Sequence, residues 1–245
     1  MMSLIACSYT SEPVNTTFST ENTQPTESTP QFIIEPVPTE PIMILPTETI
    51  PLEIESIETE PIIEETKLIP NDEEIVKIID YIPNIVIDLK YATTDNFTGK
   101  VIYDFTDAYL RYGTVKKLMN VQDKLNELGY TLVIWDAYRP VEAQWTLWNV
   151  YPDSTYVANP NTGYSSHNRG NTVDITIQKL DGESVEMPTG FDEFSKKANR
   201  DYSDVSKNAR SNALLLENIM IECGFKPLKT EWWHYSDMVK YPVVK

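Results

Sequence analysis

The chain has 245 residues, of which 41% are hydrophobic and 23% are charged, and its formal net charge at pH 7 is −17. This excess of carboxylates argues against a nucleic-acid-binding protein, because phosphate binding requires clustered lysines and arginines. Two cysteines cannot supply a disulfide framework for so long a chain, and no run of 18 apolar residues predicts a membrane-spanning helix. The composition therefore favours a protein that is stabilised by a packed core.

Composition divides the chain near residue 70. Residues 1–70 contain 10 of the 17 prolines, none of the 8 glycines, 12 acidic residues and one basic residue, so they carry −11 of the net charge. A segment of this composition with few aromatic residues is expected to stay extended or disordered. Because residues 1–70 contain many isoleucines, part of this segment could instead pack as an edge strand on the folded region. Residues 71–245 hold all the glycines and tryptophans and are long enough to bury a core.

The first residues contain a lipidation motif. Residues 4–7 read Leu-Ile-Ala-Cys, which resembles the lipobox of bacterial lipoproteins, where the cysteine carries the lipid. Only six residues precede Cys7, so the apolar part of the signal is shorter than a signal peptide requires. The motif predicts membrane attachment through a lipid on Cys7 and a location outside the cytoplasm, with residues 8–70 as a tether. A chance match would leave a cytoplasmic protein.

The elements expected in the second region alternate between helix and strand. The first is a short amphipathic helix over residues 71–79, which a capping box of Asn71 and Glu74 opens. The period of the apolar residues and the turn residues then predict, in order, a strand at 84–91, a helix at 108–128 stopped by Gly129, a strand at 130–135, a helix from Pro140, a strand at 172–177, a helix at 203–223 ended by Gly224, and a strand at 230–235. Because these elements are interspersed with short connections, we expect a compact α+β domain.

Both histidines of the chain lie in polar segments late in the sequence. His167 stands in the string Ser-Ser-His-Asn-Arg-Gly-Asn-Thr-Val-Asp, and His234 stands in Glu-Trp-Trp-His-Tyr. Asp174, on the predicted strand after the His167 loop, would complete a set of two imidazoles and one carboxylate. Such a set leaves a catalytic zinc ion one open position for water. The spacing alone also allows two structural histidines and a tryptophan pair that belongs to the core.

A carboxylate that is not a ligand would have to take a proton from that water. Glu231, three residues before His234, is the candidate. On a regular strand these two side chains point to opposite faces. Both can therefore reach one metal ion only if the strand is bulged or ends there.

The motif Ser-x-His-x-x-Gly-x-x-x-Asp, followed by Glu-x-Trp-His, is similar to that of the zinc D,D-peptidase family. The fuller form Glu-Trp-Trp-His-Tyr resembles the D-alanyl-D-alanine dipeptidase branch of the family, which includes dipeptidases of vancomycin resistance. The resemblance covers about residues 80–240, and three further segments agree with it: residues 91–99 with Tyr103, residues 135–140 and residues 187–192.

The resemblance implies a fold, a cofactor and a set of site residues. The fold is a compact hedgehog/D,D-peptidase-like α+β domain, with a central, mostly antiparallel sheet and flanking helices, preceded by a disordered tail. One zinc ion (Zn2+) would bind per chain, and D-alanyl-D-alanine or a related short D,D-dipeptide would be hydrolysed without an obligate protein partner. The implied residues are His167, Asp174 and His234 as zinc ligands, Glu231 as the general base, Arg139 for the oxyanion, Asp192 for the free ammonium of the substrate, and Ser165 near the bound dipeptide.

Several alternatives stay open. A zinc D,D-carboxypeptidase that trims peptidoglycan stem peptides would share the motif, although Asp192 favours the dipeptidase. Two histidines and a carboxylate also form the facial triad of non-haem iron oxygenases, but seven residues separate His167 from Asp174, whereas those enzymes typically place the carboxylate two residues after the first histidine. A non-catalytic, zinc-containing wall-binding module would lack the base, which is present as Glu231. Arg139 could also lie on the surface or cap a helix, and Asp192 could cap a turn.

Overall fold

The computed structural model describes residues 69–244. The lipidation motif at Cys7 and the isoleucine-rich segment lie outside the described residues, so the inferences drawn from them stay predictions. Within the described range, no helix combines the length and the apolarity that crossing a bilayer requires.

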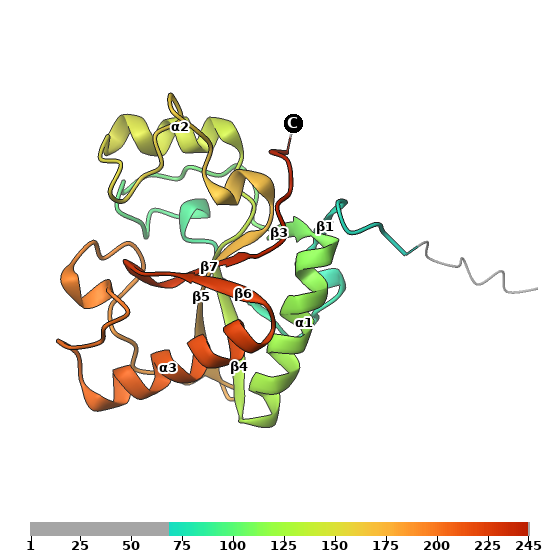
Figure 1. Ribbon diagram of the computed structural model, residues 1–245, viewed down its shortest axis with the longest axis vertical. Helices are drawn as coiled ribbons and strands as arrows, with labels where there is room; N and C mark the ends of the chain where they lie inside the picture. Colours follow the sequence, from blue (N-terminus) through green and yellow to red (C-terminus); the bar gives the residue numbers. More distant parts are fainter. Residues whose placement is uncertain (1–68, 245) are drawn as a thin grey trace, which may run out of the picture. The chain divides into compact units, whose positions relative to one another are not determined.

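A five-stranded sheet forms the centre of the domain (Figure 1). Its strands follow the order β2-β4-β5-β7-β6, and all neighbouring pairs are antiparallel except β2 with β4. The strands are β2 (Val86–Ile87), β4 (Tyr130–Asp136), β5 (Thr172–Lys179), β6 (Phe225–Leu228) and β7 (Glu231–Asp237). A separate two-stranded sheet pairs β1 (Ile75–Lys77) with β3 (Tyr109–Arg111). The predicted α+β class with a mostly antiparallel sheet is confirmed.

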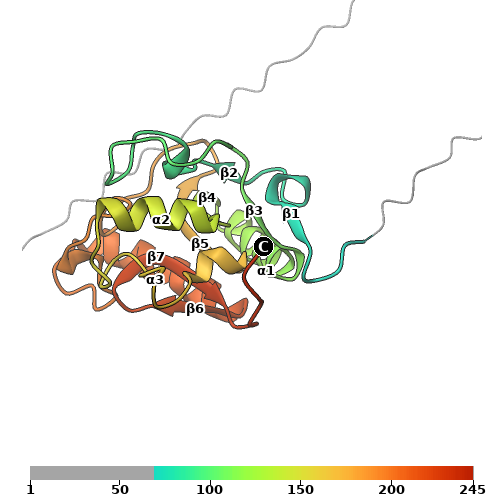
Figure 2. The ribbon, with the colours of Figure 1, turned by 90° about the horizontal axis from the view of Figure 1, so that it is seen from above.

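Three α-helices cover this sheet, namely α1 (Tyr112–Glu127), α2 (Val141–Val150) and α3 (Lys207–Glu222). Helix α1 packs against β4, and α3 packs against β6 and against α1. Figures 1 and 2 show α2 on the other side of the sheet. As predicted, Gly129 and Gly224 follow α1 and α3, with positive φ angles of 85° and 90° that other residues adopt at a cost.

The predicted helix over residues 71–79 is wrong. Asn71 Oδ1 accepts a hydrogen bond from the backbone N–H of Glu73 at 2.9 Å, so Asn71 closes a turn and caps no helix. Ile75–Lys77 then pairs with β3, and a 3-10 helix follows at Ile78–Asp80. β-Branched residues favour a strand once a partner is available. The partner strand β3 lies more than 30 residues away along the chain, so the period of apolar residues within 71–79 does not indicate it.

Three other elements differ from their prediction. The strand expected at 84–91 shortens to β2 and is followed by a 3-10 helix at Lys90–Ala92. The helix expected at 108–128 begins at Tyr112, because the residues before it form β3. Strand β6 has no counterpart among the predicted elements, since a four-residue edge strand that contains Pro227 has a weak sequence signal.

Two tryptophans of β7 belong to an aromatic part of the core. Trp232 and Trp233 are both fully buried, as expected for a core pair. The ring of Trp232 is edge-on to Trp135 at 5.6 Å between centroids, and Trp233 contacts Phe191 at 6.1 Å. Close-packed interiors have low compressibility, so these packed rings hold the backbone next to Glu231 in place.

Deleting residues 1–70 is expected to leave the domain folded and active, because the described residues bury a continuous hydrophobic core of their own. The measurement is the melting temperature and the activity of the truncated protein beside the full chain. Insolubility, or a much lower melting temperature, would show that part of the isoleucine-rich segment packs on the domain.

Candidate active site

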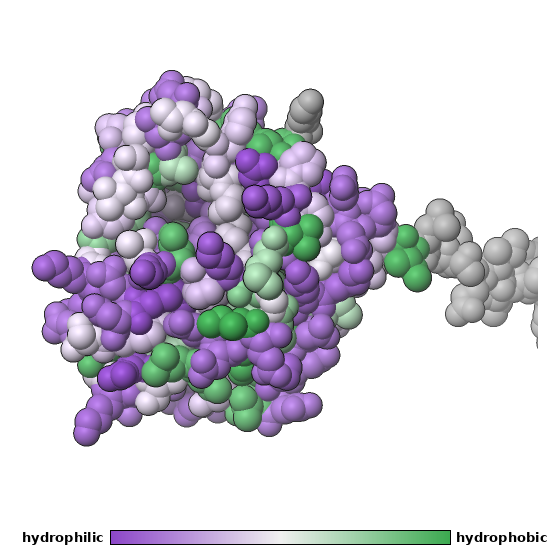
Figure 3. Space-filling view, in the orientation of Figure 1, coloured by the Kyte–Doolittle hydropathy of each residue, from purple (hydrophilic) through white to green (hydrophobic). Residues whose placement is uncertain are grey.

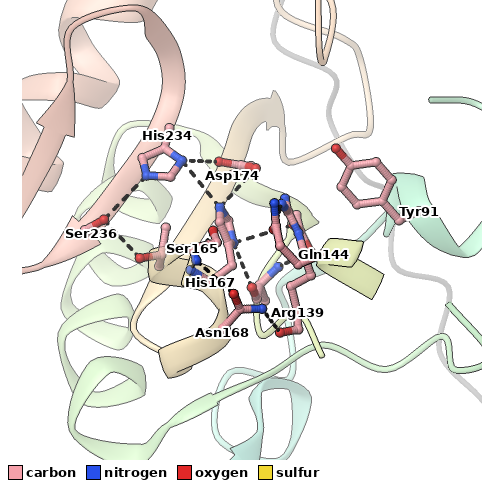
Figure 4. A network of polar contacts seen from close by, with 12 residues as sticks. Tyr91, Arg139, Gln144, Ser165, His167, Asn168, Asp174, His234 and Ser236 are labelled. Carbon is pink, nitrogen blue, oxygen red and sulfur yellow. Dashed lines mark hydrogen bonds and ion pairs between the residues drawn. The ribbon is translucent and has the colours of Figure 1, made fainter. Parts of the chain in front are cut away.

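The three side chains expected to bind metal converge on one side of the sheet (Figure 4). His167, Asp174 and His234 each place a ligand atom within 4.8 Å of the others. His167 Nε2 lies 3.3 Å from Asp174 Oδ2, and His234 Nδ1 lies 3.0 Å from Asp174 Oδ1. The two ring nitrogens are 3.4 Å apart. The chain thus folds this distant set into one cluster.

A 3-10 helix (Ser166–Arg169) carries His167 and places its ring. Ser165 and Asn168 form a capping box at the start of this helix. His167 Nδ1 lies 2.8 Å from the carbonyl oxygen of Ala137. Because a carbonyl oxygen can only accept a hydrogen bond, we assign the ring proton to Nδ1. This leaves the electron pair of Nε2 directed at Asp174, the arrangement that metal-binding histidines use.

Asp174 and His234 stand opposite each other on β5 and β7, so both point to the same face. Asp174 is 3% exposed, and its Oδ1 accepts no well-aligned hydrogen bond from the described residues. Burial acts to raise the pKa of Asp174, but the nearby imidazoles of His167 and His234 outweigh it and hold this pKa well below its usual range. A buried carboxylate with one imidazole at each oxygen, and with one oxygen unsatisfied, fits a divalent cation of the zinc type.

Glu231 lies beside the cluster, with Oε2 3.6 Å from His234 Nδ1. The strand irregularity that this approach requires is present. The register between β6 and β7 shifts, because Pro227 pairs with Tyr235 whereas its neighbour Leu228 pairs with Glu231. The regular alternation of side chains is therefore broken between Glu231 and His234. Burial raises the pKa of Glu231 to about 7, a value suited to a group that exchanges protons near neutral pH.

Arg139 is buried in the wall of the same cavity. Its Nε and Nη2 donate to Asp136 Oδ2 at 3.0 and 2.6 Å, and its Nη1 donates to Gln144 Oε1 at 2.8 Å. These three bonds use three of the five N–H donors of the guanidinium. Arg139 is 7% exposed and does not cap α2, so the surface and helix-cap alternatives are wrong.

Sequence reasoning missed the residues that hold Arg139. Asp136 is fully buried and accepts a hydrogen bond from the Tyr103 hydroxyl at 2.6 Å. Gln144, on α2, donates to the carbonyl oxygen of Ala158 at 2.8 Å. Asp136 and Tyr103 both lie in segments that carry the family resemblance, which is the one signal that could have found them. Nothing local distinguishes a buried acid on a strand from an exposed one.

Asp192 lines the cavity next to Tyr91, whose hydroxyl donates to Asp192 Oδ2 at 2.7 Å. The Arg139 guanidinium lies 5.1 Å from the centroid of the Tyr91 ring. Asp192 has a φ of 54°, a left-handed conformation that is costly for a residue other than glycine and is typical of functional sites. Burial raises its pKa to about 8. Its carboxylate accepts no backbone hydrogen bond within the described range, so the turn-cap alternative is wrong.

Ser165 has a structural part in this site. Its Oγ accepts a hydrogen bond from the backbone N–H of His167 at 3.3 Å, and its backbone N–H donates to Asn168 Oδ1 at 2.9 Å. Ser165 also lines the cavity, but the contact with a bound dipeptide stays a prediction.

All seven residues predicted for the site lie around one cavity of about 530 Å³. The cavity lies between the segment that follows α2 and the β6–β7 hairpin, where Figure 3 shows the surface hollowed. Phe194 and Tyr156 stack at 4.5 Å between centroids and form part of its aromatic wall. Pockets of this size hold small molecules and short peptides.

The last described residues fasten the segment that carries His167. Val244 N donates to the carbonyl oxygen of Asn168 at 2.9 Å, and Arg169 Nη1 donates to that of Tyr241 at 2.8 Å. The position of the 3-10 helix therefore depends on residues more than 70 positions away along the chain.

Known proteins resemble this chain in sequence. A peptidase family described as "D-ala-D-ala dipeptidase" matches residues 71–241. The D-alanyl-D-alanine dipeptidase of Escherichia coli (strain K12) is 36% identical over 173 residues, which cover 70% of this chain and 89% of that protein. The D-alanyl-D-alanine dipeptidase of Enterococcus faecium is 34% identical over 168 residues, which cover 60% of this chain and 83% of that protein.

Two solved structures are also similar. The structure of VanYB in complex with D-Alanine-D-Alanine has a TM-score of 0.36 and 18% identity, and the match covers 54% of this chain and 73% of that one. The structure of the LdcB LD-carboxypeptidase has a TM-score of 0.41 and 17% identity, and the match covers 69% of this chain and 68% of that one.

Proposed function

The chain belongs to the D-alanyl-D-alanine dipeptidase family of peptidases, and from this premise we propose that it is a zinc metallopeptidase that hydrolyses D-alanyl-D-alanine to two molecules of D-alanine. The observation that carries this proposal is the meeting of a histidine–aspartate–histidine cluster with two further acids in one cavity. One of these acids, Glu231, is next to the cluster, and the other, Asp192, is held by Tyr91. Glu231 can act as the general base, and Asp192 can bind the ammonium group of the substrate.

One zinc ion per chain would be held by His167 Nε2, His234 Nδ1 and the carboxylate of Asp174. When bound, zinc lowers the pKa of a water molecule and polarises a carbonyl group. The orphaned Asp174 Oδ1 supports this assignment, because a metal ion would satisfy it. The orienting bond from His167 Nδ1 to Ala137 supports it as well.

Glu231 and Arg139 supply the remaining chemistry. The Glu231 carboxylate can receive a proton from the attacking water and return it to the nitrogen of the leaving D-alanine, since its pKa of about 7 allows both steps. N–H donors of Arg139 that do not bind Asp136 or Gln144 can stabilise the negative charge that develops on the scissile carbonyl oxygen. Asp136 and Gln144 lock the guanidinium in place, so little reorganisation is needed during the reaction.

Asp192 is the residue that favours a dipeptidase over a D,D-carboxypeptidase. A free ammonium group of the substrate can pair with this carboxylate and stabilise its charged form, against the burial that raises its pKa. A blocked or extended substrate has no ammonium at this position. It would leave the half-buried Asp192 without a charged partner, which costs binding energy.

The experiment that tests this function measures kcat/KM for D-alanyl-D-alanine, for its N-acetyl form and for a stem pentapeptide. We expect the free dipeptide to be preferred by at least about 100-fold, because loss of a charge-assisted bond to a buried group costs about 3 kcal/mol and each 1.36 kcal/mol is tenfold in rate. Asp192→Asn should reduce this preference, mainly by slowing the free dipeptide. Glu193→Gln, at the exposed neighbouring acid, is the matched control and should leave it unchanged. Equal rates on free and blocked substrates would contradict the dipeptidase and favour the carboxypeptidase.

We also propose that the protein acts outside the cytoplasm, attached to the bacterial membrane by a lipid on Cys7. The Leu-Ile-Ala-Cys motif and the acidic, proline-rich residues that follow it support this location. Metabolic labelling with radioactive palmitate should mark the wild-type protein in the membrane fraction and should not mark Cys7→Ala. An unlabelled wild-type protein in the cytosolic fraction would make the motif a chance match.

A further inference from the structure

The proposed substrate is a zwitterion, and Asp192 accounts for its ammonium only. In Figure 4, Tyr91, which binds Asp192, and Ser236 lie on opposite sides of the three metal-binding residues. A dipeptide whose ammonium lies at Asp192 and whose peptide bond lies at the cluster therefore extends its C-terminal carboxylate toward Ser236.

Lys226 is directly opposite Ser236 in the pairing of β6 with β7. Opposed residues of an antiparallel pair place their side chains on the same face, with Cβ atoms about 5 Å apart. His234, two residues before Ser236 on β7, shares this face. Ser236 Oγ lies 3.4 Å from His234 Nε2, so this row of side chains runs from the metal cluster to Lys226. Lys226 also lines the cavity.

The charge of Lys226 is uncommitted. Its ammonium forms no ion pair and no hydrogen bond with another side chain in residues 69–244. The second cation of the cavity wall, Arg139, binds Asp136 and Gln144, and its remaining donors are assigned above to the scissile carbonyl oxygen. Every other charged residue of the wall that does not bind metal is acidic. An anionic group that enters this cavity therefore finds one cation free to receive it.

We propose that Lys226 binds the C-terminal carboxylate of the dipeptide and so makes the enzyme specific for substrates that end in a free carboxylate. This inference rests on the proposed function. A lysine carries its charge on a flexible stem, so it can reach a carboxylate beside the strand without a fixed geometry. Together, Lys226 and Asp192 span a substrate of fixed length, because each binds one end of it. The two contacts hold the peptide bond between them, where the catalytic groups act.

The test compares D-alanyl-D-alanine with D-alanyl-D-alaninamide, which lacks the carboxylate. We expect Lys226→Ala to lower kcat/KM for the dipeptide about tenfold, mainly through KM, because it removes one charge-assisted contact to a part of the substrate that does not react. The same variant should leave kcat/KM for the amide almost unchanged. If turnover of the amide is too slow to follow, its inhibition constant against the dipeptide should be almost unchanged instead. Lys226→Arg should restore most of the loss. High ionic strength should not abolish the effect, as it would if Lys226 acted only by long-range attraction.

Lys229→Ala is the matched control, because Lys229 is an exposed lysine in the same hairpin that does not line the cavity. It should leave kcat/KM unchanged for both compounds. Lys226 is itself exposed, so its alanine variant should keep the wild-type melting temperature. The inference would be overturned if Lys226→Ala lowered kcat/KM equally for dipeptide and amide, if Lys229→Ala lowered it as much, or if Lys226→Ala did not lower it at all. In each of these cases a wild-type enzyme that is active on the dipeptide would leave the proposed function standing. A wild-type protein that does not cleave the dipeptide would overturn both.

Discussion

Replacing Glu231 by glutamine is expected to lower kcat by about 10²–10⁴-fold, because the proton acceptor is lost while the metal ligands remain. KM should change much less, since Glu231 lies beside the cluster on the reacting side and binds neither end of the proposed substrate. The glutamine has nearly the volume of the glutamate, and the buried position raises the pKa of Glu231 to about 7, so an uncharged amide is tolerated there. The variant should therefore fold and retain zinc.

The measurements are steady-state kinetics on D-alanyl-D-alanine and the zinc content of the purified variant. Glu222→Gln is the control, because Glu222 is an exposed glutamate at the end of α3 that pairs with Lys124. It should keep wild-type kinetics. A loss in Glu231→Gln of less than tenfold, with zinc bound, would show that another residue is the base.

Substitution of His234 by alanine should remove zinc and abolish activity. The cluster offers three ligand atoms, and His234 Nδ1 is one of them. Loss of residues that merely orient metal ligands weakens binding by about 10–100-fold, so loss of a ligand itself should weaken it by more than about 100-fold. The same reasoning predicts that zinc raises the melting temperature of the wild type, because a metal ion that binds the folded state alone stabilises it.

Elemental analysis should find about one equivalent of zinc in the wild type and much less in His234→Ala. Adding zinc after chelation should restore the melting temperature and activity of the wild type and should not shift either in the variant. Lys240→Ala, an exposed change shortly after β7, should behave as the wild type. Full zinc content in His234→Ala would remove His234 from the ligand set.

The sequence predicted most of the elements whose apolar residues follow a clear period. Strands β4, β5 and β7 and helix α3 lie where the periodicity places them, within about four residues. The helix expected at 71–79 failed because its residues satisfy their backbone by pairing with β3, and such pairing between distant segments leaves no local period. Strand β6 is too short for a period to develop.

The candidate site divides in the same way. Residue chemistry and spacing suggested the three ligands and the need for an irregular strand at Glu231, and the register shift in β7 now shows how the chain meets that need. Residue chemistry and spacing could not predict the positions of Asp136 and Gln144 behind Arg139, since their contacts depend on how β4 and α2 lie against each other. Lys226 could not be predicted either, because its place beside Ser236 follows from the register of β6, an element that the sequence does not signal.

The bonds from the end of the chain to the 3-10 helix of His167 bear on how the protein should be produced. Val244 donates to the backbone of that helix and Tyr241 accepts from its Arg169 side chain, so a group fused close to these residues is expected to disturb the segment that holds a metal ligand. Residues before 71 make no such bond among those described, and the segment there is predicted to be extended. A tag at the N-terminus should therefore preserve zinc binding where a C-terminal tag of equal size lowers it, and preparations that differ in tag position should not be compared as if they were the same enzyme.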